Sequence, residues 1–345
     1  MPVTLTGVSD AKRMAELQAA VGLRIADEAL LDELSAGLAK VETLLREAVR
    51  SDVAFVDAAA RHLTEAGGKR FRPLFTLLAG QFGDGGTDDV VTAAAAVELV
   101  HLATLYHDDV MDEATMRRGA QSANARWDNT VAILTGDLLF AHASRLVAQL
   151  GTEPTRIIAE TMNELVTGQI RETVGARDGE DPIEHYLTVI AQKTGSLIAT
   201  SGRFGAMLSG AAPEHVAALR QFGEIIGVAF QISDDIIDIA SGSDVLGKEQ
   251  GTDLREGVRT LPMLYALNDD EENSRLIELL STPLTDDDEV AEAVELLRSS
   301  AGLEHARETL REYTLRARAE LAPLPDSAAR DACESVADYL AARTN

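Results

Sequence analysis

Apolar residues recur every three or four positions along most of this chain, which is the spacing of one face of an α-helix. The segment 26–50 is a clear example, with Leu30, Leu34, Leu38 and Leu45 on one face and charged residues between them. The same spacing predicts further helices over 55–66, 73–83, 89–112, 130–150, 155–174, 182–209, 213–239, 262–280, 288–298 and 304–322.

Breaks rich in Gly and Pro separate these segments, and most are short, as connections between packed helices are. They fall at 83–87, 151–154, 178–182, 210–213, 281–283 and 323–325. Alternation of apolar and polar residues, which would indicate a strand, extends over no more than about four residues at a time. The pattern predicts an all-α protein, and we expect one large domain over 1–345 with helices packed around a central space.

Composition and charge narrow the range of functions. Hydrophobic residues make up 46% of the chain, enough for a large core, and the formal net charge is −26. Nucleic-acid binding depends on Lys and Arg that neutralise phosphates, so we expect no nucleic-acid partner. The same net charge argues against electrostatic attraction to an anionic membrane surface.

We expect neither a signal peptide nor a membrane span. Residues 1–10 lack a basic stretch followed by an apolar run, and no run of about 20 apolar residues is uninterrupted. The single cysteine, Cys333, cannot form an internal disulfide, and we interpret it as a small buried hydrophobic residue. Together these features predict a cytoplasmic protein.

Two signatures of the form Asp-Asp-x-x-Asp carry the most specific chemistry. They comprise Asp108, Asp109 and Asp112 in the first, and Asp234, Asp235 and Asp238 in the second. Carboxylates four residues apart on a helix share one face, with Cβ atoms about 5–6 Å apart, and they repel each other unless a cation neutralises them. Oxygen ligands suit Mg²⁺, which is commonly shared between carboxylates and substrate phosphates.

A solvated helix face or an N-cap would explain one such signature taken alone. Both signatures, however, follow apolar stretches, 101–106 for the first and 225–230 for the second, and a solvated face would not be embedded in this way. We therefore predict two carboxylate faces that bind Mg²⁺ together with a phosphorylated ligand.

Basic residues near the signatures are candidates for binding the phosphates. In 67–73 a glycine pair precedes Lys69, Arg70 and Arg72; glycine permits close approach of a ligand, and the arginine fork grips a diphosphate. An ordinary loop with surface cations would have the same composition. Further cations follow at Arg117, Arg118, Lys193 and Lys248. Those at 117–118 would equally suit pairing with the carboxylates of the first signature.

Taken together, these residues resemble the trans-isoprenyl (polyprenyl) diphosphate synthases, of the medium- and long-chain bacterial type. The matching elements occur in the family's order and cover roughly residues 60–265. They are 68–73, His101, 107–112, 117–119, Gly136 with Asp137, Lys193 with Thr194, 230–238, Gly247 with Lys248, and 251–253. Each element is weak alone, but the ordered set is highly specific.

The resemblance implies an all-α fold with a deep cavity between helices, and a homodimer. It implies that Asp108, Asp112 and Asp234 are the principal Mg²⁺ ligands, with about three ions per active site when substrate is bound. It also implies that the remaining aspartates of the signatures, Asp109, Asp235 and Asp238, support them directly or through water. Lys193 would join the principal ligands in catalysis.

The same resemblance implies two diphosphate-binding sets. The set that would hold isopentenyl diphosphate is Lys69, Arg72, His101 and Arg118. The set that would face the allylic diphosphate is Arg117, Lys193, Thr194, Gln231 and Lys248. Without the surrounding motif, His101 would be interpreted as a satisfied core histidine. One departure is visible: where the family usually has lysine after glycine, this chain has Val258, and Arg259 follows as a possible substitute.

Side chains one and two turns before Asp108 would line the channel for the growing product, because each helical turn advances about 5.4 Å, comparable with one isoprene unit. These positions are Ala103 and Thr104, then Leu99 and Val100. Family members with short products tend to carry an aromatic residue at the first level, so the small residues predict a product of about six isoprene units or more. Alternatively these are compact core residues, and a neighbouring helix closes the channel, for which Phe140 is a candidate.

The implied reaction joins an allylic diphosphate, such as farnesyl or geranylgeranyl diphosphate, to successive isopentenyl diphosphate units, and the product is delivered to a membrane. A class I terpene cyclase is one alternative, but such enzymes typically lack the 67–70 loop and the second acidic signature. A non-catalytic subunit of a heterodimeric synthase is another, but such subunits usually have eroded signatures, whereas both are intact here.

Overall fold

The computed structural model describes residues 22–240, 251–269 and 274–344. The predicted all-α class is confirmed: within these residues, extended structure is limited to one hairpin, β1 (Met116–Arg117) paired with β2 (Ala120–Gln121). Each segment whose apolar periodicity predicted a helix contains one, but two segments are divided. Segment 262–280 holds α14 (Leu261–Asp269) and α15 (Ser274–Leu279), and segment 182–209 holds α9 (Pro182–Ile190), the π-helix η1 (Ala191–Gly195) and α10 (Ser196–Leu208).

Contacts within the chain divide it into two compact units. Unit 1 is drawn from Met1–Met162, Leu197–Gly223 and Leu321–Val336, and unit 2 from Asn163–Ser196, Glu224–Glu320 and Ala337–Asn345. Four helices contribute residues to both units: α8 (Thr152–Val174), α10 (Ser196–Leu208), α11 (Pro213–Ala240) and α18 (Ala328–Ala342). The expectation of a single domain stays a prediction.

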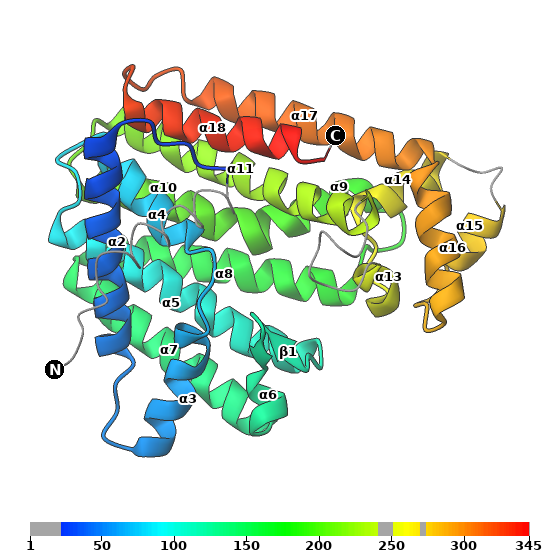
Figure 1. Ribbon diagram of the computed structural model, residues 1–345, viewed down its shortest axis with the longest axis horizontal. Helices are drawn as coiled ribbons and strands as arrows, with labels where there is room; N and C mark the ends of the chain where they lie inside the picture. Colours follow the sequence, from blue (N-terminus) through cyan, green and yellow to red (C-terminus); the bar gives the residue numbers. More distant parts are fainter. Residues whose placement is uncertain (1–21, 241–250, 270–273, 345) are drawn as a thin grey trace, which may run out of the picture. The chain divides into compact units, whose positions relative to one another are not determined.

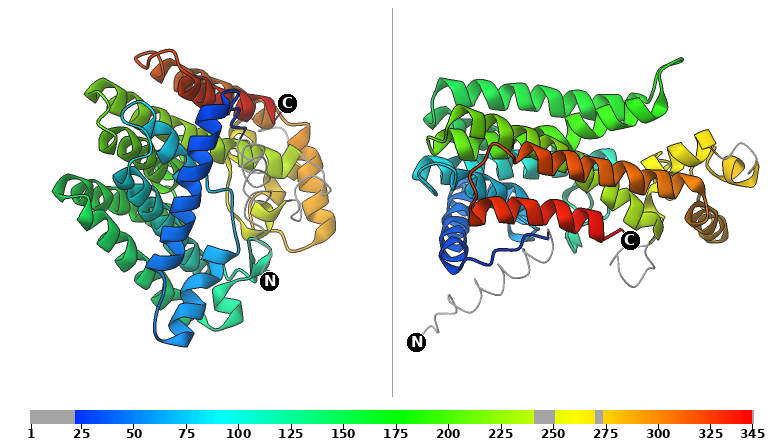
Figure 2. Two further views of the ribbon diagram at one scale, coloured as in Figure 1. Left: turned by 60° about the vertical axis from the view of Figure 1, so that its left-hand side comes forward. Right: turned by 90° about the horizontal axis from the view of Figure 1, so that it is seen from above.

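Unit 1 is built around helix α5 (Asp88–Met111). This helix packs against α7 (Asn129–Gln149) and α4 (Phe71–Gly80), and α2 (Glu28–Ala48) lies across α4 and α5 (Figures 1 and 2). The unit also contains α3 (Ala54–Glu65), α6 (Ala123–Arg126) and nearly all of α10 (Ser196–Leu208).

The sequence of α5 explains its central place. Thr87 caps the first turn by accepting a hydrogen bond from the Val90 N–H at 3.3 Å, and Asp88 and Asp89 complement the helix dipole. Most of the following side chains are apolar and fully buried, including the alanines of 93–96. A helix that is apolar on all sides is stable only when it is surrounded by protein, so α5 forms the core of unit 1.

Two described helices, α5 and α7, are long and apolar enough to cross a membrane by length and composition alone. The most apolar stretch of α5 is 72% buried inside the protein, as in the core helix of a soluble protein, whereas that of α7 is 39% buried. This is weak evidence for a span, and the expectation that no span exists stays a prediction.

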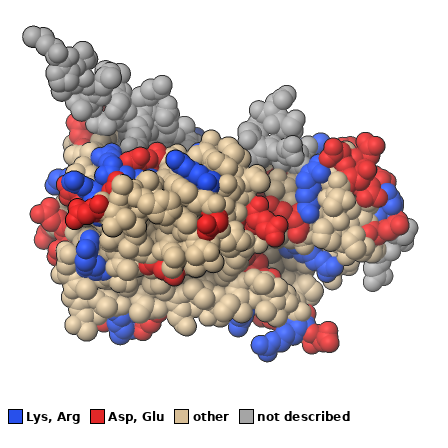
Figure 3. Space-filling view, turned by 90° about the horizontal axis from the view of Figure 1, so that it is seen from below, with Lys and Arg blue, Asp and Glu red and all other residues tan. Residues whose placement is uncertain are grey.

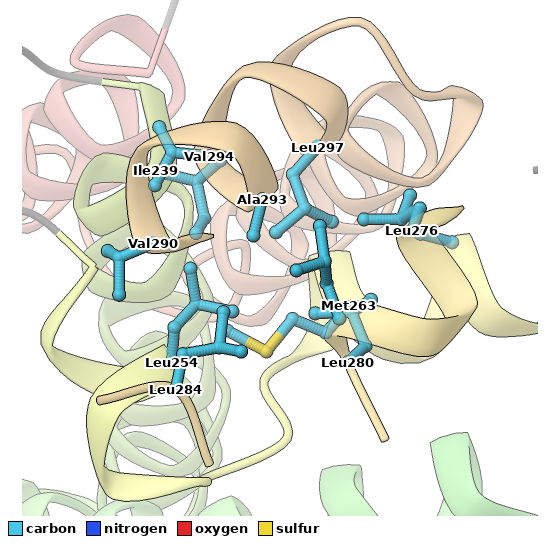
Figure 4. Close-up of a cluster of buried hydrophobic side chains, with 12 residues drawn as sticks. Ile239, Leu254, Met263, Leu276, Leu280, Leu284, Val290, Ala293, Val294 and Leu297 are labelled. Atoms are coloured by element: carbon cyan, nitrogen blue, oxygen red, sulfur yellow. The ribbon is translucent and has the colours of Figure 1, made fainter. Parts of the chain in front are cut away.

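Unit 2 has its own hydrophobic core, which Figure 4 shows in close-up. Buried side chains meet there from α11 (Ile239), α13 (Thr252–Glu256), α14, α15 and α16 (Asp287–Arg298). At the end of α16, Arg298 donates from Nε to the carbonyl oxygen of Ile239 at 2.9 Å. The core therefore fixes the C-terminal end of α11. Unit 2 also contains α9 (Pro182–Ile190), the π-helix η1 (Ala191–Gly195) and α17 (Ala301–Glu320), which packs against α14.

Helix α18 follows the break at 323–325 and was not among the predicted helices. It carries Cys333, which is fully buried, as predicted, and burial raises the pKa of its thiol.

Charged side chains are interspersed on the face drawn in Figure 3, where Lys and Arg lie among Asp and Glu with uncharged surface between them. The whole sequence carries a formal net charge of −26. A place where cations outnumber carboxylates is therefore a specialised feature of this molecule.

Candidate active site

The first acidic signature occupies the last turn of α5. Asp112 is exposed, Asp108 is half-buried and Asp109 is fully buried. No basic residue lies in this last turn, and the negative end of the helix dipole disfavours carboxylates there. Carboxylates at this end of α5 therefore lower the stability of the fold when no cation is bound, which is expected where they serve to bind a cation.

Arg117 pairs with the first signature, as the sequence allowed. Its Nε lies 2.6 Å from Asp109 Oδ1, and its Nη2 lies 3.6 Å from Asp112 Oδ2. Burial raises the pKa of Asp109, and the hydrogen bond from Arg117 partly offsets this rise. The fully buried Asp109 thus anchors Arg117 beside Asp112. A direct bond from Asp109 to an ion stays a prediction.

Arg118 is held in a strained hairpin turn. It and Gly119 have positive φ, 54° and 76°, as a two-residue type I′ turn between β1 and β2 requires. For a non-glycine residue this conformation costs about 1–3 kcal/mol and is typical of functional sites. The Arg118 guanidinium donates to the Gly67 carbonyl and lies 3.8 Å from Glu98 Oε1.

Gly68 makes room for the Arg118 side chain. A Cβ at Gly68 would lie 2.6 Å from Cζ of Arg118, and Gly68 has a φ of +133°. The glycine pair of the 67–73 segment therefore receives a cation of this same chain, in addition to any role in approaching a ligand.

The cations of the 67–73 segment lie in different environments. Arg70 is 2% exposed and donates to Glu42 at 2.8 Å, Glu98 at 2.7 Å and the Thr64 carbonyl at 2.7 Å. Its pKa is raised, because Glu98 and Glu42 outweigh the opposing effect of burial. Arg70 is a structural residue within the protein, and it does not serve as the third ligand-facing cation that the segment suggested.

Arg72 and Lys69 are available to an anion. Arg72 Nε is buried and finds no hydrogen-bond partner among the described residues. Burial lowers the pKa of Arg72 to about 10, so it stays charged at neutral pH. Lys69 is exposed and makes no hydrogen bond or ion pair within the part of the chain that the structure describes.

His101 lies among these arginines and is neutral. Its pKa is well below the usual range, first because the ring is buried and then because of the positive charges of Arg72, Arg118, Arg70 and Arg117. The four arginines of this group outnumber the three buried carboxylates that contact them, those of Glu42, Glu98 and Asp109. Unit 1 thus holds an excess of cations next to the acidic end of α5, which suits a phosphate bridged to a metal ion.

The residues proposed for chain length lie along α5 and α7. Leu99, Val100 and Ala103 are fully buried, whereas Thr104 is half-buried and donates to the His101 carbonyl at 2.8 Å. The Phe140 ring centroid is 5.6 Å from that of His107.

Gly136 permits the close packing of α7 on α5. A Cβ there would lie 2.3 Å from Nε2 of His107, which contacts the Ile133 carbonyl at 3.1 Å and Asp137 Oδ1 at 3.4 Å. His107, for which the sequence suggested no role, therefore joins the two helices.

The second acidic signature occupies the C-terminal part of α11, in unit 2. Asp234 is exposed and forms an ion pair with Arg343, with Nη2 at 2.5 Å from Oδ1. Asp238 is half-buried, and no basic residue lies in the last turn of α11. The carboxylates again lie at the negative end of a helix dipole.

Asp235 is buried, like Asp109 at the same position of the first signature. The Tyr186 hydroxyl donates to its Oδ2, and Gln231 Nε2 donates to its Oδ1 at 2.9 Å. Burial raises the pKa of Asp235 well above the usual range, and the negative charge of Asp253 adds to the rise. Sequence reasoning missed Tyr186, whose only signal was its position two turns before Lys193.

Lys193 and Thr194 lie on η1, a π-helix between α9 and α10. Such single-turn bulges are frequent at functional sites. Both residues are half-buried, and Lys193 Nζ donates to Glu172 of α8. Glu172 is a further site residue that the sequence did not indicate.

Some expected site residues lie elsewhere. Gly247 and Lys248 lie outside the described residues. Arg259 is exposed and lines a small pocket with Asp253 and Val258, and its substitution for the missing lysine stays a prediction. Because the two acidic signatures belong to different units, their joint action also stays a prediction.

The residues present fit Mg²⁺ shared with a substrate. Among the described residues, no three Asp, Glu, His or Cys side chains converge as a preassembled metal cluster. Mg²⁺ usually takes only one or two carboxylates, together with water and substrate phosphates. Asp108 with Asp112 in unit 1, and Asp234 in unit 2, are the acidic-signature oxygens with the access that such ions require.

Comparison with known proteins agrees with this chemistry. Residues 53–297 match the family model described as polyprenyl synthetase. The nonaprenyl diphosphate synthase of Mycobacterium tuberculosis is 53% identical over 324 residues, which cover 93% of this chain and 97% of that protein.

Two crystal structures share the fold. Geranylgeranyl pyrophosphate synthase from Corynebacterium glutamicum, complexed with calcium and isoprenyl diphosphate, has a TM-score of 0.84 and 50% identity over 93% of this chain and 99% of that one. Decaprenyl diphosphate synthase from Rhodobacter capsulatus has a TM-score of 0.84 and 34% identity over 92% and 99%. The resemblance seen in the sequence is confirmed, and the chain belongs to the polyprenyl synthetase family.

Proposed function

We propose that the protein is a Mg²⁺-dependent trans-prenyltransferase. It condenses an allylic diphosphate, farnesyl or geranylgeranyl diphosphate, with successive isopentenyl diphosphate units and releases inorganic diphosphate at each step. The observation that carries this proposal is that Asp108 and Asp112 lie at the end of α5 beside Arg117, in a group of arginines that outnumbers its buried carboxylates. A diphosphate bound to Mg²⁺ interacts favourably with both groups: the arginines bind its phosphate oxygens, and the carboxylates bind the metal ion.

The residues of unit 1 bind isopentenyl diphosphate. Arg72 and Arg118 direct buried positive charge at its phosphates, Lys69 adds an exposed cation, and the neutral ring of His101 supplies a hydrogen bond. Their role is to position the double bond of this substrate, because holding reactants in place contributes much of the rate in such reactions.

The residues of unit 2 bind the allylic diphosphate. Lys193 and Thr194 on η1 hold its phosphates, and Asp234 provides an exposed carboxylate for the ions. Mg²⁺, when bound, stabilises the negative charge that grows on the departing diphosphate. No side-chain nucleophile is required, and the released diphosphate is the base that takes the proton. Apolar walls exclude water that would otherwise react with the allylic cation.

The product is a long-chain all-trans polyprenyl diphosphate, of about six isoprene units or more. Support comes from small side chains at Ala103 and Thr104 and from the 53% identity to a nonaprenyl diphosphate synthase. The similarity at 50% to a geranylgeranyl pyrophosphate synthase makes a shorter product the second candidate.

The protein acts as a homodimer in the cytoplasm and delivers its product to a membrane. Exposed apolar side chains support a second copy as partner. Leu134 of α7 is 61% exposed, and Val166, Ile170 and Val174 recur every four residues on one face of α8. Exposed apolar strips of this kind are typical of interfaces between subunits.

One incubation tests the reaction. The purified protein is given Mg²⁺, radiolabelled isopentenyl diphosphate and farnesyl diphosphate, with a matched sample in EDTA. Label in linear polyprenyl diphosphate that depends on Mg²⁺ supports the proposal, and chromatography of the product gives its length. A cyclic hydrocarbon would indicate a cyclase. Absence of incorporation by the dimer would indicate a subunit that requires another chain.

A further inference from the structure

The buried hydrogen bond between Tyr186 and Asp235 connects two elements of the proposed allylic site. Tyr186 lies on α9, which continues through η1, and Asp235 lies beside Asp234 on α11. We infer that Tyr186 is a positioning residue, which holds the helical run carrying Lys193 against the acidic signature of α11. This inference rests on the proposed function, because it concerns binding of the allylic diphosphate.

Asp235 is suited to anchoring another residue. Its side chain is 3% exposed, and each of its oxygens accepts a hydrogen bond from a neutral donor of the protein, Tyr186 or Gln231. Asp234, one residue earlier, is more than half exposed. The two neighbouring carboxylates therefore have different roles. Asp234 is open to ions, and both oxygens of Asp235 are hydrogen-bonded within unit 2.

The helical run from α9 to α10 leaves little room for Lys193 to move independently. On the side of α8, a Cβ at Gly168 would lie 2.7 Å from the backbone nitrogen of Lys193. On the side of α11, a Cβ at Gly195 would lie 3.0 Å from the Glu224 carbonyl oxygen. The bulge is thus packed tightly on two sides. A change in the placement of α9 would shift Lys193 relative to Asp234.

The hydroxyl of Tyr186 is the part of the side chain that matters for this role. Its ring is 9% exposed and would fill the same space as phenylalanine. Without the hydroxyl, Asp235 would keep only Gln231 as a donor, and a buried carboxylate that lacks a partner is strongly disfavoured. Unit 2 would relax by moving α9 or α11, which changes the distance between Lys193 and the ions.

The test uses Tyr186→Phe, with Tyr106→Phe as the matched control. Tyr106 is also buried, and its hydroxyl donates to the Ala59 carbonyl at 2.6 Å within unit 1. Binding of farnesyl S-thiolodiphosphate, an unreactive analogue, is measured by calorimetry with Mg²⁺, and KM is measured for each substrate. We expect Tyr186→Phe to weaken analogue binding and raise the allylic KM about tenfold. The KM for isopentenyl diphosphate should change little, and Tyr106→Phe should leave the allylic KM unchanged.

Equal analogue binding by wild type and Tyr186→Phe would overturn the inference, as would equal effects of both variants. Failure of the wild type itself to bind the analogue would instead overturn the proposed function. Asp235→Asn separates anchoring from metal binding, because the amide still accepts from Tyr186 and can donate to a rotated Gln231. We expect this variant to bind the analogue more tightly than Tyr186→Phe does at the same Mg²⁺ concentration, because the hydrogen bond from Tyr186 is kept. A large rise in the Mg²⁺ requirement would make Asp235 an ion ligand and contradict the inference.

Discussion

Arg343 forms an ion pair with Asp234, the first aspartate of the second acidic signature, with 2.5 Å between Nη2 and Oδ1. The same guanidinium donates from Nε to the hydroxyl of Ser233 at 2.5 Å and lies over the ring of Phe230, 5.4 Å from its centroid. The Arg343 side chain is 11% exposed, whereas that of Asp234 is 56% exposed. A cation from the end of α18 therefore supports one side of Asp234 and leaves the other side open.

We predict that Arg343→Met lowers the free energy of unfolding by about 1–3 kcal/mol, because it removes a charge-assisted hydrogen bond to buried Ser233 and a cation–π contact. Arg318→Met is the matched control, since Arg318 of α17 pairs with Asp338 of α18 at the surface. That variant should cost less than about 1 kcal/mol. Urea denaturation followed by circular dichroism measures the stability of both variants. Equal losses would contradict the prediction, because they would mean that Arg343 contributes no more than a surface ion pair.

Two arginines of the 67–73 segment should give opposite phenotypes. Arg70→Met removes the one cation that is hydrogen-bonded to both buried glutamates, Glu42 and Glu98, so we expect a loss of about 3–5 kcal/mol in stability. Arg72→Met breaks no ion pair among the described residues, so its stability should change little, while the KM for isopentenyl diphosphate rises by about tenfold or more. Denaturation and steady-state kinetics on both variants check this contrast. Similar effects of the two on stability would argue against the assignment of Arg72 to substrate.

Substitution of the glycine pair tests the placement of Arg118. Gly68→Ala would bring a methyl group to 2.6 Å from the Arg118 guanidinium, so we expect the KM for isopentenyl diphosphate to rise about tenfold. Gly67→Ala is the control, because Gly67 also has a positive φ, +89°, but has open space around its Cβ position. Both variants place an L side chain at a positive φ, which strains the backbone. An equal rise in KM for both would mean that loop strain, and not Arg118, determines binding.

The contrast between Arg70 and Arg72 also shows where sequence reasoning stops. The acidic signatures, the helices that carry them and the cation-rich segment follow from spacing and residue type. One residue separates Arg70 from Arg72, yet Arg70 is buried on Glu42 and Glu98, whereas the buried Nε of Arg72 finds no hydrogen-bond partner among the described residues. The difference arises because α4 begins at Phe71 and Arg70 takes a left-handed conformation, with a φ of 41°. No local sequence pattern predicts this left-handed conformation at Arg70.

The spacing of residues in the sequence also could not predict which distant residues contact the predicted site residues. Glu172, Tyr186 and Arg343 contact Lys193, Asp235 and Asp234, respectively, and none of them belongs to the same element as its partner. Helical periodicity indicates which face of a segment is buried, and it does not identify the segment packed against that face. Helix α18, which ends just before Arg343, was itself missed at the sequence level.

The neutral state of His101 predicts a specific dependence of stability on pH. Its pKa in the folded protein lies below the usual value of about 6.5, so the unfolded chain binds more protons below that pH. This residue therefore contributes stability above pH 6.5 that is lost as the pH falls toward its folded pKa. The raised pKa values of Asp109 and Asp235 act in the opposite direction, so the stability of the wild type as a function of pH does not by itself isolate the contribution of His101.

The difference between wild type and His101→Gln isolates this contribution. We expect the variant to lose less stability than wild type between about pH 6.5 and pH 5, and the two curves to run parallel above pH 7. Denaturation midpoints at closely spaced pH values provide the measurement. Parallel curves throughout would mean that His101 titrates normally in the folded protein and is not surrounded by uncompensated positive charge.

The length of the product tests the channel beside α5. Ala103 is fully buried, and its carbonyl oxygen lies 3.1 Å from the position of a Cβ on Gly136, so Ala103→Tyr introduces a ring where α5 and α7 are closely packed. We predict a shorter product, because the ring blocks the channel one helical turn below Asp108, about one isoprene unit from the reacting end. Thr104→Tyr, at a half-buried position, should also shorten it with less strain. Reversed-phase chromatography of the dephosphorylated products measures the change.

Thr92→Tyr is the matched control on the same helix. Thr92 and Thr104 both donate to a carbonyl of the preceding turn, of Asp88 and His101 respectively, and both are half-buried. Position 92 is more than four helical turns before Asp108, so an added ring there should reduce stability without altering product length. A shortened product from Thr104→Tyr alone would place the channel along the last turns of α5. Unchanged length in both Ala103→Tyr and Thr104→Tyr would contradict that placement and turn attention to α7, where the ring of Phe140 lies beside His107.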